Sequence, residues 1–219
     1  MIKKSTLKFL SSLKKNNNRD WFEKNKADYL TAKSDMEQMV RKLLIEMSKK
    51  EKALARLDPS KCMFRIYRDV RFSKDKRPYK HNLSAGINPG GKNAEGPGYY
   101  VHIEPGNSFI AGGTWLPEPP KLAAIRQEID YNSKKFLQII NAAPFKRFFG
   151  KLSEDEKLKT APKGYPKDHP QLEYLKLKSF LVWHKLNDSA ITSTSCVKKI
   201  ASAAAAMIPL NNFIREAMD

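Results

Sequence analysis

Two kinds of hydrophobic spacing divide the chain into three stretches. In residues 1–60 and 119–219 apolar residues recur every three or four positions, which is typical of amphipathic helices. In residues 61–118 apolar and polar positions alternate, and Gly, Pro and Asn are frequent, which indicates strands joined by turns. This order predicts a single α+β domain over residues 1–219, with one more strand in the last stretch. We expect a mostly antiparallel sheet of about five strands, with N- and C-terminal helices packed on it.

The predicted helices begin and end at recognisable signals. A first helix runs from Ser5 to Lys15 and ends in the Asn-rich turn that follows. A second begins at Asp20, where Asp20 and Glu23 have the spacing of a capping box, and continues as one long helix to about Lys50. The remaining helices are predicted over residues 121–131, 133–142 and 171–177 and from 194 onward, where Pro209 bends the last one.

Five strands follow from the alternating pattern. Pro105-Gly106 marks a tight hairpin between two of them, and the Gly-rich residues 88–97 form a longer loop. The predicted strands are Met63 to Phe72, Leu83 to Asn88, Gly98 to Glu104, Ser108 to Trp115 and residues 180–185.

The chain is strongly basic, with a net charge of +18 and a pI of about 9.8. Lysine is spread along the whole sequence, as in a solvated surface coat. Arginine is not, because four of the ten arginines lie between Arg65 and Arg77. Arginine suits bidentate pairing with carboxylate or phosphate, so this segment is a candidate anion site.

Alternation along the first and third predicted strands places polar side chains on shared faces. If the two faces coincide, they form one surface to which the following loop adds more side chains. Arginine and lysine there could hold an anion, while His102 or His81 could transfer a proton near neutral pH. Alternatively, Arg65, Arg68, Asp69 and Glu104 pair with one another across strands and have no further role. Arg71 continues the face of Arg65, whereas Arg68 lies on the opposite face of the strand. The predicted surface contains Arg65, Tyr67, Asp69, Tyr100, His102 and Glu104, with Lys76, Tyr79, Lys80 and His81 from the loop.

A second candidate is the proline-rich loop of residues 162–170. Its prolines restrict the backbone, so Lys163, Asp168 and His169 are held in one shape, as a binding site requires. Alternatively, Asp168 caps the helix that begins near Pro170, and His169 has no role. Gly112 and Gly113 ahead of Trp115 could let a ligand approach the backbone, although glycine at a strand end also marks a bulge.

Several functional classes lack support. Walker, GxGxxG, GxSxG and HExxH motifs are absent, and no pair of histidines has ligand-type spacing, so we predict neither metal nor cofactor. No stretch approaches the roughly 20 apolar residues of a membrane span. Cys62 and Cys196 are expected to be free buried thiols, and the compartment to be the cytoplasm.

Four stretches of the chain resemble the uncharacterised bacterial and fungal family catalogued as domain of unknown function 2461. They occur in family order and span nearly the whole chain. The resemblance implies a single domain and no established activity. It draws attention to Phe72, Gly113, Trp115 and Gly164 beside the candidates above. The matching stretches are NNRDWFEKNKADY, RIYRDVRFSKDKRPYK, GYYVHIEPGNSFIAGGTWLPEPP, and PKGYPKDHP with the following LKLKSFLVWHKL.

The leading hypothesis is a cytoplasmic domain with a basic pocket for an anionic, phosphate-bearing small ligand, in which catalysis is undecided. Arg65, Arg68 and Lys80 would hold the anion, and His102 with Glu104 or Asp168 would act as the acid–base pair. One alternative is a sequence-independent nucleic-acid-binding protein, against which the diffuse charge and the lack of an exposed aromatic series count. Another is an interaction module that docks an acidic partner protein. The sequence does not determine the oligomeric state.

Overall fold

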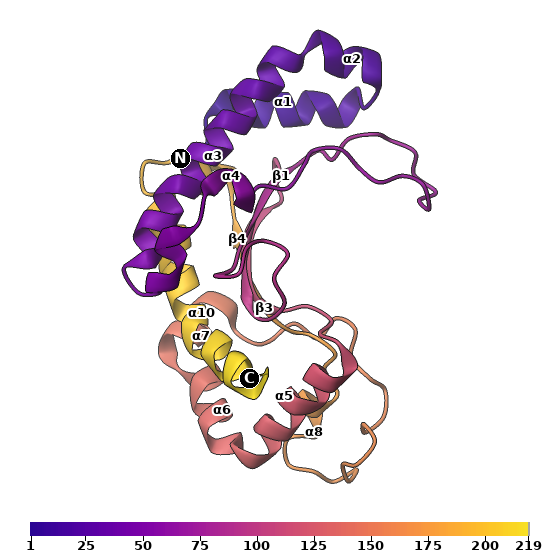
Figure 1. Cartoon of the computed structure of the whole chain (residues 1–219), viewed down its shortest axis with the longest axis vertical. Coiled ribbons are helices and arrows are strands. Elements are labelled where there is room, and N and C mark those ends of the chain that lie inside the picture. The colour runs from indigo at the N-terminus through magenta and orange to yellow at the C-terminus, as the bar shows by residue number, and fades with distance from the viewer. Residues whose placement is uncertain (219) are drawn as a thin grey trace. The chain divides into compact units, whose positions relative to one another are not determined.

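The fold was analysed in a computed structural model that describes residues 1–218 (Figure 1). These residues form ten α-helices, one 3-10 helix and four strands, so the predicted α+β class is confirmed. They divide into two compact units. Unit 1 comprises Met1–Asn93, Tyr100–Ile110 and Lys185–Ser202, and unit 2 comprises Ala94–Tyr99, Ala111–His184 and Ala203–Asp219. Whether the chain behaves as the predicted single domain stays a prediction.

The N-terminal helices of unit 1 pack through buried apolar side chains. Helix α1 (Lys4–Lys15) buries Leu10 and Leu13 against α3 (Lys26–Ser48). Asp35 of α3 is buried there, and its Oδ2 accepts hydrogen bonds from the Lys3 backbone N–H and the Thr6 hydroxyl at 2.7 Å each. A 3-10 helix η1 (Lys52–Arg56) and the short α4 (Pro59–Cys62) follow α3 along the chain.

The prediction of one helix from Asp20 to Lys50 is wrong, because the chain breaks at Asn25 into α2 (Arg19–Lys24) and α3. The Asn25 side chain donates to the Trp21 carbonyl, and such local bonds compete with helix continuation. The predicted capping box is also wrong. Asn18 is the N-cap, since its side chain accepts from the Trp21 N–H at 2.9 Å.

Four strands form one antiparallel sheet in the order β1-β2-β3-β4. Four of the five predicted strands are therefore present, with ends that differ by a residue or two. Gly106, at φ +74°, makes the tight turn between β2 and β3. The strands are β1 (Leu83–Ile87), β2 (Gly98–Ile103), β3 (Ser108–Thr114) and β4 (Phe180–Leu186).

The predicted strand Met63 to Phe72 does not form. In the described chain this segment keeps only isolated bridges, Met63 to Ala85 and Tyr67 to Tyr79. Beyond Tyr67 it becomes a loop, which we call the arm (residues 68–78). The arm is closed by a bond from the Arg68 N–H to the Pro78 carbonyl. Two aspartates turn the backbone there, because each accepts the N–H two residues on and so replaces a ladder bond.

Unit 2 packs helices around buried phenylalanines, Phe136, Phe145, Phe180 and Phe213 among them. Gly112 in β3 allows a close approach of α10, since a Cβ there would lie 2.4 Å from Met207 Sδ. The predicted helices over 121–131, 133–142 and 171–177 are present with shifted ends, whereas α7 and α9 were not predicted. The remaining helices are α5 (Pro119–Tyr131), α6 (Ser133–Asn141), α7 (Ala143–Phe149), α8 (Leu172–Leu175), α9 (Asp188–Thr192) and α10 (Cys196–Met218).

Candidate functional site

A line of polar side chains follows one face of β2 into the residue beyond it. Tyr100, His102 and Glu104 alternate with apolar neighbours and therefore point the same way. The Tyr100 hydroxyl lies 3.1 Å from His102 Nδ1, and His102 Nε2 lies 3.2 Å from Glu104 Oε2. Phe109 of β3 stacks on the imidazole with ring centroids 4.8 Å apart and fixes its plane. We call Tyr100, His102 and Glu104 the relay.

The charge states of the relay follow from its burial. Burial lowers the pKa of His102, and the hydrogen bond with Glu104 opposes this without cancelling it. Burial alone would raise the pKa of Glu104, but bonds with His102, Lys14 and Asn107 outweigh it, so that pKa is lowered. A neutral imidazole beside a carboxylate must donate through Nε2–H, which leaves Nδ1 to accept from the Tyr100 hydroxyl.

Glu104 is also close to the side chains of Lys14 and His81, which come from elsewhere in unit 1. Lys14, in the last turn of α1, places its ammonium 3.3 Å from Glu104 Oε1. His81 Nδ1 lies 3.2 Å from the same oxygen but in a geometry that makes no hydrogen bond. His81 Nδ1 is thus a buried polar atom with no hydrogen-bond partner among residues 1–218. Such atoms are uncommon and require an explanation.

Two lysines lie against the ring of Phe64, whose centroid lies 6.0 Å from that of Tyr100, and Arg65 is close enough to one of them, Lys80, to act on its charge. The Lys80 and Lys92 ammonium groups lie 5.6 and 5.8 Å from the centre of the Phe64 ring. Lys92 also donates to the Met63 carbonyl at 2.6 Å. Burial lowers the pKa of Lys80, and the nearby charge of Arg65 lowers it further. Within the described chain, no carboxylate forms an ion pair with any of these three cations.

The arginines of the arm, by contrast, are paired locally. Arg68 and Arg77 both contact Asp75 Oδ2 at 2.7 Å, and Arg71 contacts Asp69 Oδ2 at 2.7 Å. These pairs differ from the cross-strand pairs considered in the sequence analysis. The guanidinium of Arg71 holds the pKa of Asp69 below its usual range. Mainly the guanidinium of Arg77 does the same for Asp75.

Two further candidates from this region support the arm. The Lys76 ammonium donates to the Val70 carbonyl at 3.0 Å across the arm. Tyr79 is buried and stacks on Phe22 with ring centroids 3.9 Å apart. The Asn17 carboxamide bonds to both the Tyr79 carbonyl and its N–H, at 2.9 and 3.0 Å. The contacts of Tyr79 are therefore those of a packing residue.

The remaining candidates belong to unit 2. His169 Nε2 lies 2.9 Å from Asp130 Oδ1, and its Nδ1 accepts the Gln171 N–H at 3.0 Å. Both ring nitrogens are occupied, so in this arrangement the imidazole has no free nitrogen for a substrate. Asp168 is exposed and does not cap α8, whose N-cap is Gln171, so the capping alternative is wrong. Lys163 is exposed.

Trp115 lies at the mouth of a shallow hollow in unit 2. Its side chain is 70% exposed, and the hollow measures about 190 Å³. The next residue, Leu116, has φ +42°, an uncommon value for a residue with a side chain. An ion pair between Lys121 and Glu95 lies on the wall of this hollow. Trp115 is thus accessible to solvent, and its role as a ligand-binding residue stays a prediction.

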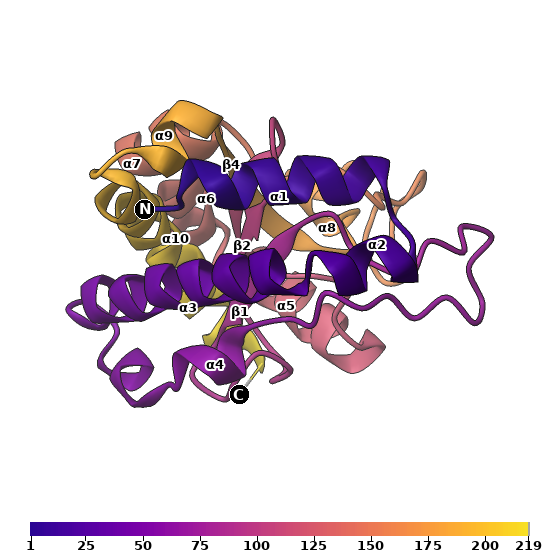
Figure 2. The same ribbon diagram turned by 90° about the horizontal axis from the view of Figure 1, so that it is seen from above.

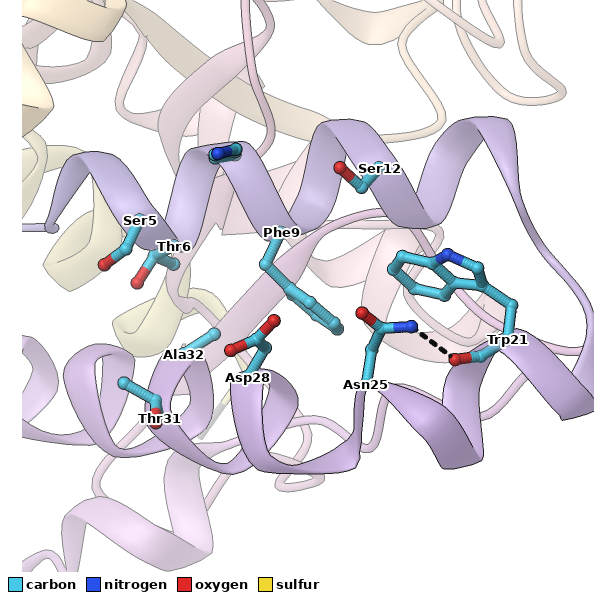
Figure 3. A pocket seen from close by; sticks show the side chains of 10 residues that line it. Ser5, Thr6, Phe9, Ser12, Trp21, Asn25, Asp28, Thr31 and Ala32 are labelled. Carbon is cyan, nitrogen blue, oxygen red and sulfur yellow. Dashed lines mark hydrogen bonds between the residues drawn. The ribbon is translucent and has the colours of Figure 1, made fainter.

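A larger hollow of about 380 Å³ lies in unit 1 between α1 and the helices α2 and α3 (Figure 3). Phe9 and Trp21 form its aromatic wall, with ring centroids 6.0 Å apart. The Asn25 carboxamide and the Asp28 carboxylate point into it from the opposite side, as Figure 3 shows. Trp21 is therefore only partly buried, whereas its neighbour Phe22 is fully buried.

Some site residues could not be found by sequence reasoning. Lys14 and Lys92 lie in the lysine-rich background and carry no local signal, and Asp130 looks like any helix-surface acid. Only the tertiary structure brings Lys14 to Glu104 across 90 positions. No group of three or more His, Cys, Asp or Glu side chains within residues 1–218 is arranged to hold a metal ion.

A family model described as "Conserved hypothetical protein (DUF2461)" matches residues 5–213. The chain belongs to this family. The match covers the relay, the arm and the loop of residues 162–170, and it confirms the resemblance noted from the motifs. No match to this DUF2461 chain was found among curated proteins or among solved structures.

Proposed function

We propose that this DUF2461 protein binds a small anionic, phosphate-bearing ligand in unit 1, at Lys80, Arg65 and Lys92 beside the relay. The observation that carries the proposal is the half-buried Lys80 ammonium, which has no ion-pair partner in the described chain and whose pKa is lowered. Burying an uncompensated cation is costly, and a ligand anion would remove that cost. A phosphate would also offset the repulsion between Lys80 and Arg65.

Arg68 was expected to hold the anion, and we now give that role to Lys92. Arg68 donates to the Asp75 carboxylate and to the Arg77 carbonyl, at 2.7 and 3.0 Å. Its guanidinium is therefore already engaged within the arm. Lys92 has no carboxylate partner in residues 1–218 and shares the Phe64 ring with Lys80.

The relay adds a route for a proton beside the anion. Burial raises the pKa of Tyr100, so its hydroxyl would pass a proton to Nδ1 of neutral His102 only as it receives another, and the Glu104 carboxylate would stabilise the imidazolium that forms. The ligand would replace that proton by giving one of its own to the Tyr100 oxygen. In this proposal the acid–base pair is His102 with Glu104, and Asp168 and His169 take no part.

The expected compartment is the cytoplasm. Cys62 and Cys196 are buried free thiols, a state that reducing compartments preserve. None of the helices in residues 1–218 has both the length and the apolar character that a membrane crossing needs.

Thermal unfolding with inorganic phosphate, pyrophosphate and nucleotides tests the proposal. A ligand at a hundred times its dissociation constant should add about 2.7 kcal/mol of stability to the wild type. Lys80→Met should bind at least about tenfold more weakly, because the unpaired cation is gone. Lys33→Met is the matched control, since Lys33 is an exposed lysine of α3 outside both the anion site and the arm.

The same variants separate ligand binding from a structural role. Without ligand, Lys80→Met should melt at or above the wild-type temperature, because the substitution removes a half-buried charge. An earlier melt of unliganded Lys80→Met would identify Lys80 as a structural residue. Equal anion responses of Lys80→Met and Lys33→Met would refute the site.

A further inference from the structure

The arm projects from unit 1 and carries an exposed aromatic residue. Figures 1 and 2 show this loop extending away from α2, α3 and β1. Phe72 lies on it with 96% of its surface exposed. A phenylalanine exposed to this extent gains nothing from apolar burial within this chain, so its ring is free to contact a partner.

The arm is braced internally. The Arg68 and Arg77 side chains share the Asp75 carboxylate, and Asp69 holds Arg71 through two hydrogen bonds at 3.0 and 2.7 Å. Lys76 adds a bond to the Val70 carbonyl across the arm. These bonds fix the loop before any partner arrives, which lowers the entropy that binding would cost.

The base of the arm is also held firmly. Tyr79, next to the arm, stacks on Phe22 of α2 and pairs with the Asn17 carboxamide through both backbone groups. Tyr67 packs against Tyr79, with ring centroids 5.4 Å apart. The arm is therefore mounted on the helical part of unit 1 through an aromatic cluster.

Charge and ring geometry indicate what the arm contacts. Five cations and two carboxylates make up its charge. The three arginines pair with the two carboxylates, Asp75 being shared, and Lys74 and Lys76 form no ion pair in the described residues, so the arm keeps a net charge of +3. The Arg71 guanidinium lies 5.8 Å from the centre of the Phe72 ring, so two planar groups that can stack on bases lie side by side.

We infer that the arm docks single-stranded nucleic acid, with a base stacked on Phe72 and backbone phosphates on Lys74 and Lys76. An unpaired strand offers free base faces beside phosphates, which match the aromatic group and the cations of the arm. A membrane surface fits less well, because one phenylalanine beside paired arginines supplies little apolar area for insertion. The long-range attraction of a chain with net charge +18 assists capture of any polyanion.

Fluorescence anisotropy with a labelled oligothymidylate of about 16 nucleotides tests this inference. Phe72→Ala should weaken binding about 5- to 150-fold, the range expected for loss of one stacked base. Phe72→Trp should keep wild-type affinity or improve on it. Tyr131→Ala is the matched control, since Tyr131 is another aromatic residue, 73% exposed, in unit 2, and it should bind like the wild type.

Lys74→Met should reduce the slope of log affinity against log salt by about 0.7, the value for one phosphate contact of a single strand. A wild type that fails to bind the oligonucleotide at low salt overturns the inference. So does a Phe72→Ala variant that binds as well as the wild type. Anionic vesicles that capture the wild type more tightly than the oligonucleotide does, and that lose Phe72→Ala, would make the arm a membrane contact instead.

The proposed binding of nucleic acid by the arm and the proposed binding of an anion at Lys80 can be tested separately. Phe72→Ala should keep the thermal response to inorganic phosphate, because Phe72 is not part of that site. Lys80→Met should keep most of its oligonucleotide affinity, because Lys80 lies outside the arm.

Discussion

His102 illustrates what a single residue gains from its surroundings. Its alternation with Tyr100 and Glu104 could be predicted from the sequence, and the structure joins the three side chains by hydrogen bonds. Its burial could not be predicted, and burial is the main cause that lowers its pKa. The structure therefore makes His102 a neutral proton acceptor, whereas the sequence only marked it as titratable.

The pH dependence of stability should report this environment. Because the pKa of His102 is lowered on folding, the folded state binds fewer protons than the unfolded state below the ordinary value of 6.5. Stability should therefore fall as pH decreases from 6.5 towards the folded pKa, by at most about 1.4 kcal/mol per pH unit. His102→Gln should remove this part of the slope in urea unfolding measured between about pH 7 and 5.

Glu104 should act in a lower pH range. Its pKa is also lowered on folding, so its contribution is fully present above 4.5 and is lost as pH falls through the folded pKa. Glu104→Gln should flatten that acidic part of the curve. It should also extend the His102 slope to lower pH, because the bond that opposes the lowering of the His102 pKa is lost.

His184→Gln is the control for His102→Gln, because it removes a different histidine. If His102→Gln and His184→Gln give the same slopes, the relay does not set the pH response.

Local chemistry and the strand pattern compete at the level of elements. Residues 63–72 alternate like a strand, yet Asp69 and Asp75 bind nearby backbone N–H groups and turn the chain into the arm. Strand β3, by contrast, was predicted from its alternating pattern. Within it, the structure requires glycine at position 113. It adopts φ +112°, and a Cβ there would lie 1.9 Å from the Phe180 carbonyl oxygen in β4.

Gly113→Ala should therefore be strongly destabilising. The clashing atom is backbone, so it cannot move away without disturbing the pairing of β3 and β4, and the positive φ adds strain. We expect a loss of at least about 3 kcal/mol in the free energy of unfolding, measured by urea titration. Gly91→Ala is the matched control, because Gly91 has φ +96° with no atom within 4 Å of the added Cβ. Its cost should be only about 1–2 kcal/mol, and equal losses would contradict this account.

At the scale of the whole molecule, the division into units does not follow the elements. Strands β2, β3 and β4 and helix α10 each contribute residues to both units. An element that melts in one unit therefore loses its continuation in the other. This continuity favours cooperative unfolding, in line with the single domain expected from the sequence.

Tryptophan fluorescence can test that cooperativity. Trp21 belongs to unit 1, whereas Trp115 and Trp183 belong to unit 2. A variant with Trp115→Phe and Trp183→Phe reports on unit 1, and Trp21→Phe reports on unit 2. Each should show the same urea midpoint by fluorescence and by circular dichroism. A fluorescence midpoint that differs from the circular dichroism midpoint of the same variant would show that the units unfold independently.

The sequence by itself determined the α+β class, four of the strands, most helices and the family. Hydrophobic periodicity and turn residues encode these features within short windows. It also identified the basic segment, because arginine clustering is visible in one dimension. The break at Asn25 and the arm could not be predicted, since each depends on hydrogen bonds between side chains and the backbone that compete with a regular helix or strand.

Only the tertiary structure decided which charges remain uncompensated. Lys80 and Arg68 look equivalent in the sequence, yet Arg68 has an aspartate partner and Lys80 has none among residues 1–218. The ion pair between Lys14 and Glu104 likewise joins residues far apart in the chain. The burial of His102 also depends on the folded chain around it. The physical reason is that pairing and desolvation depend on distance in space, which local sequence patterns do not contain.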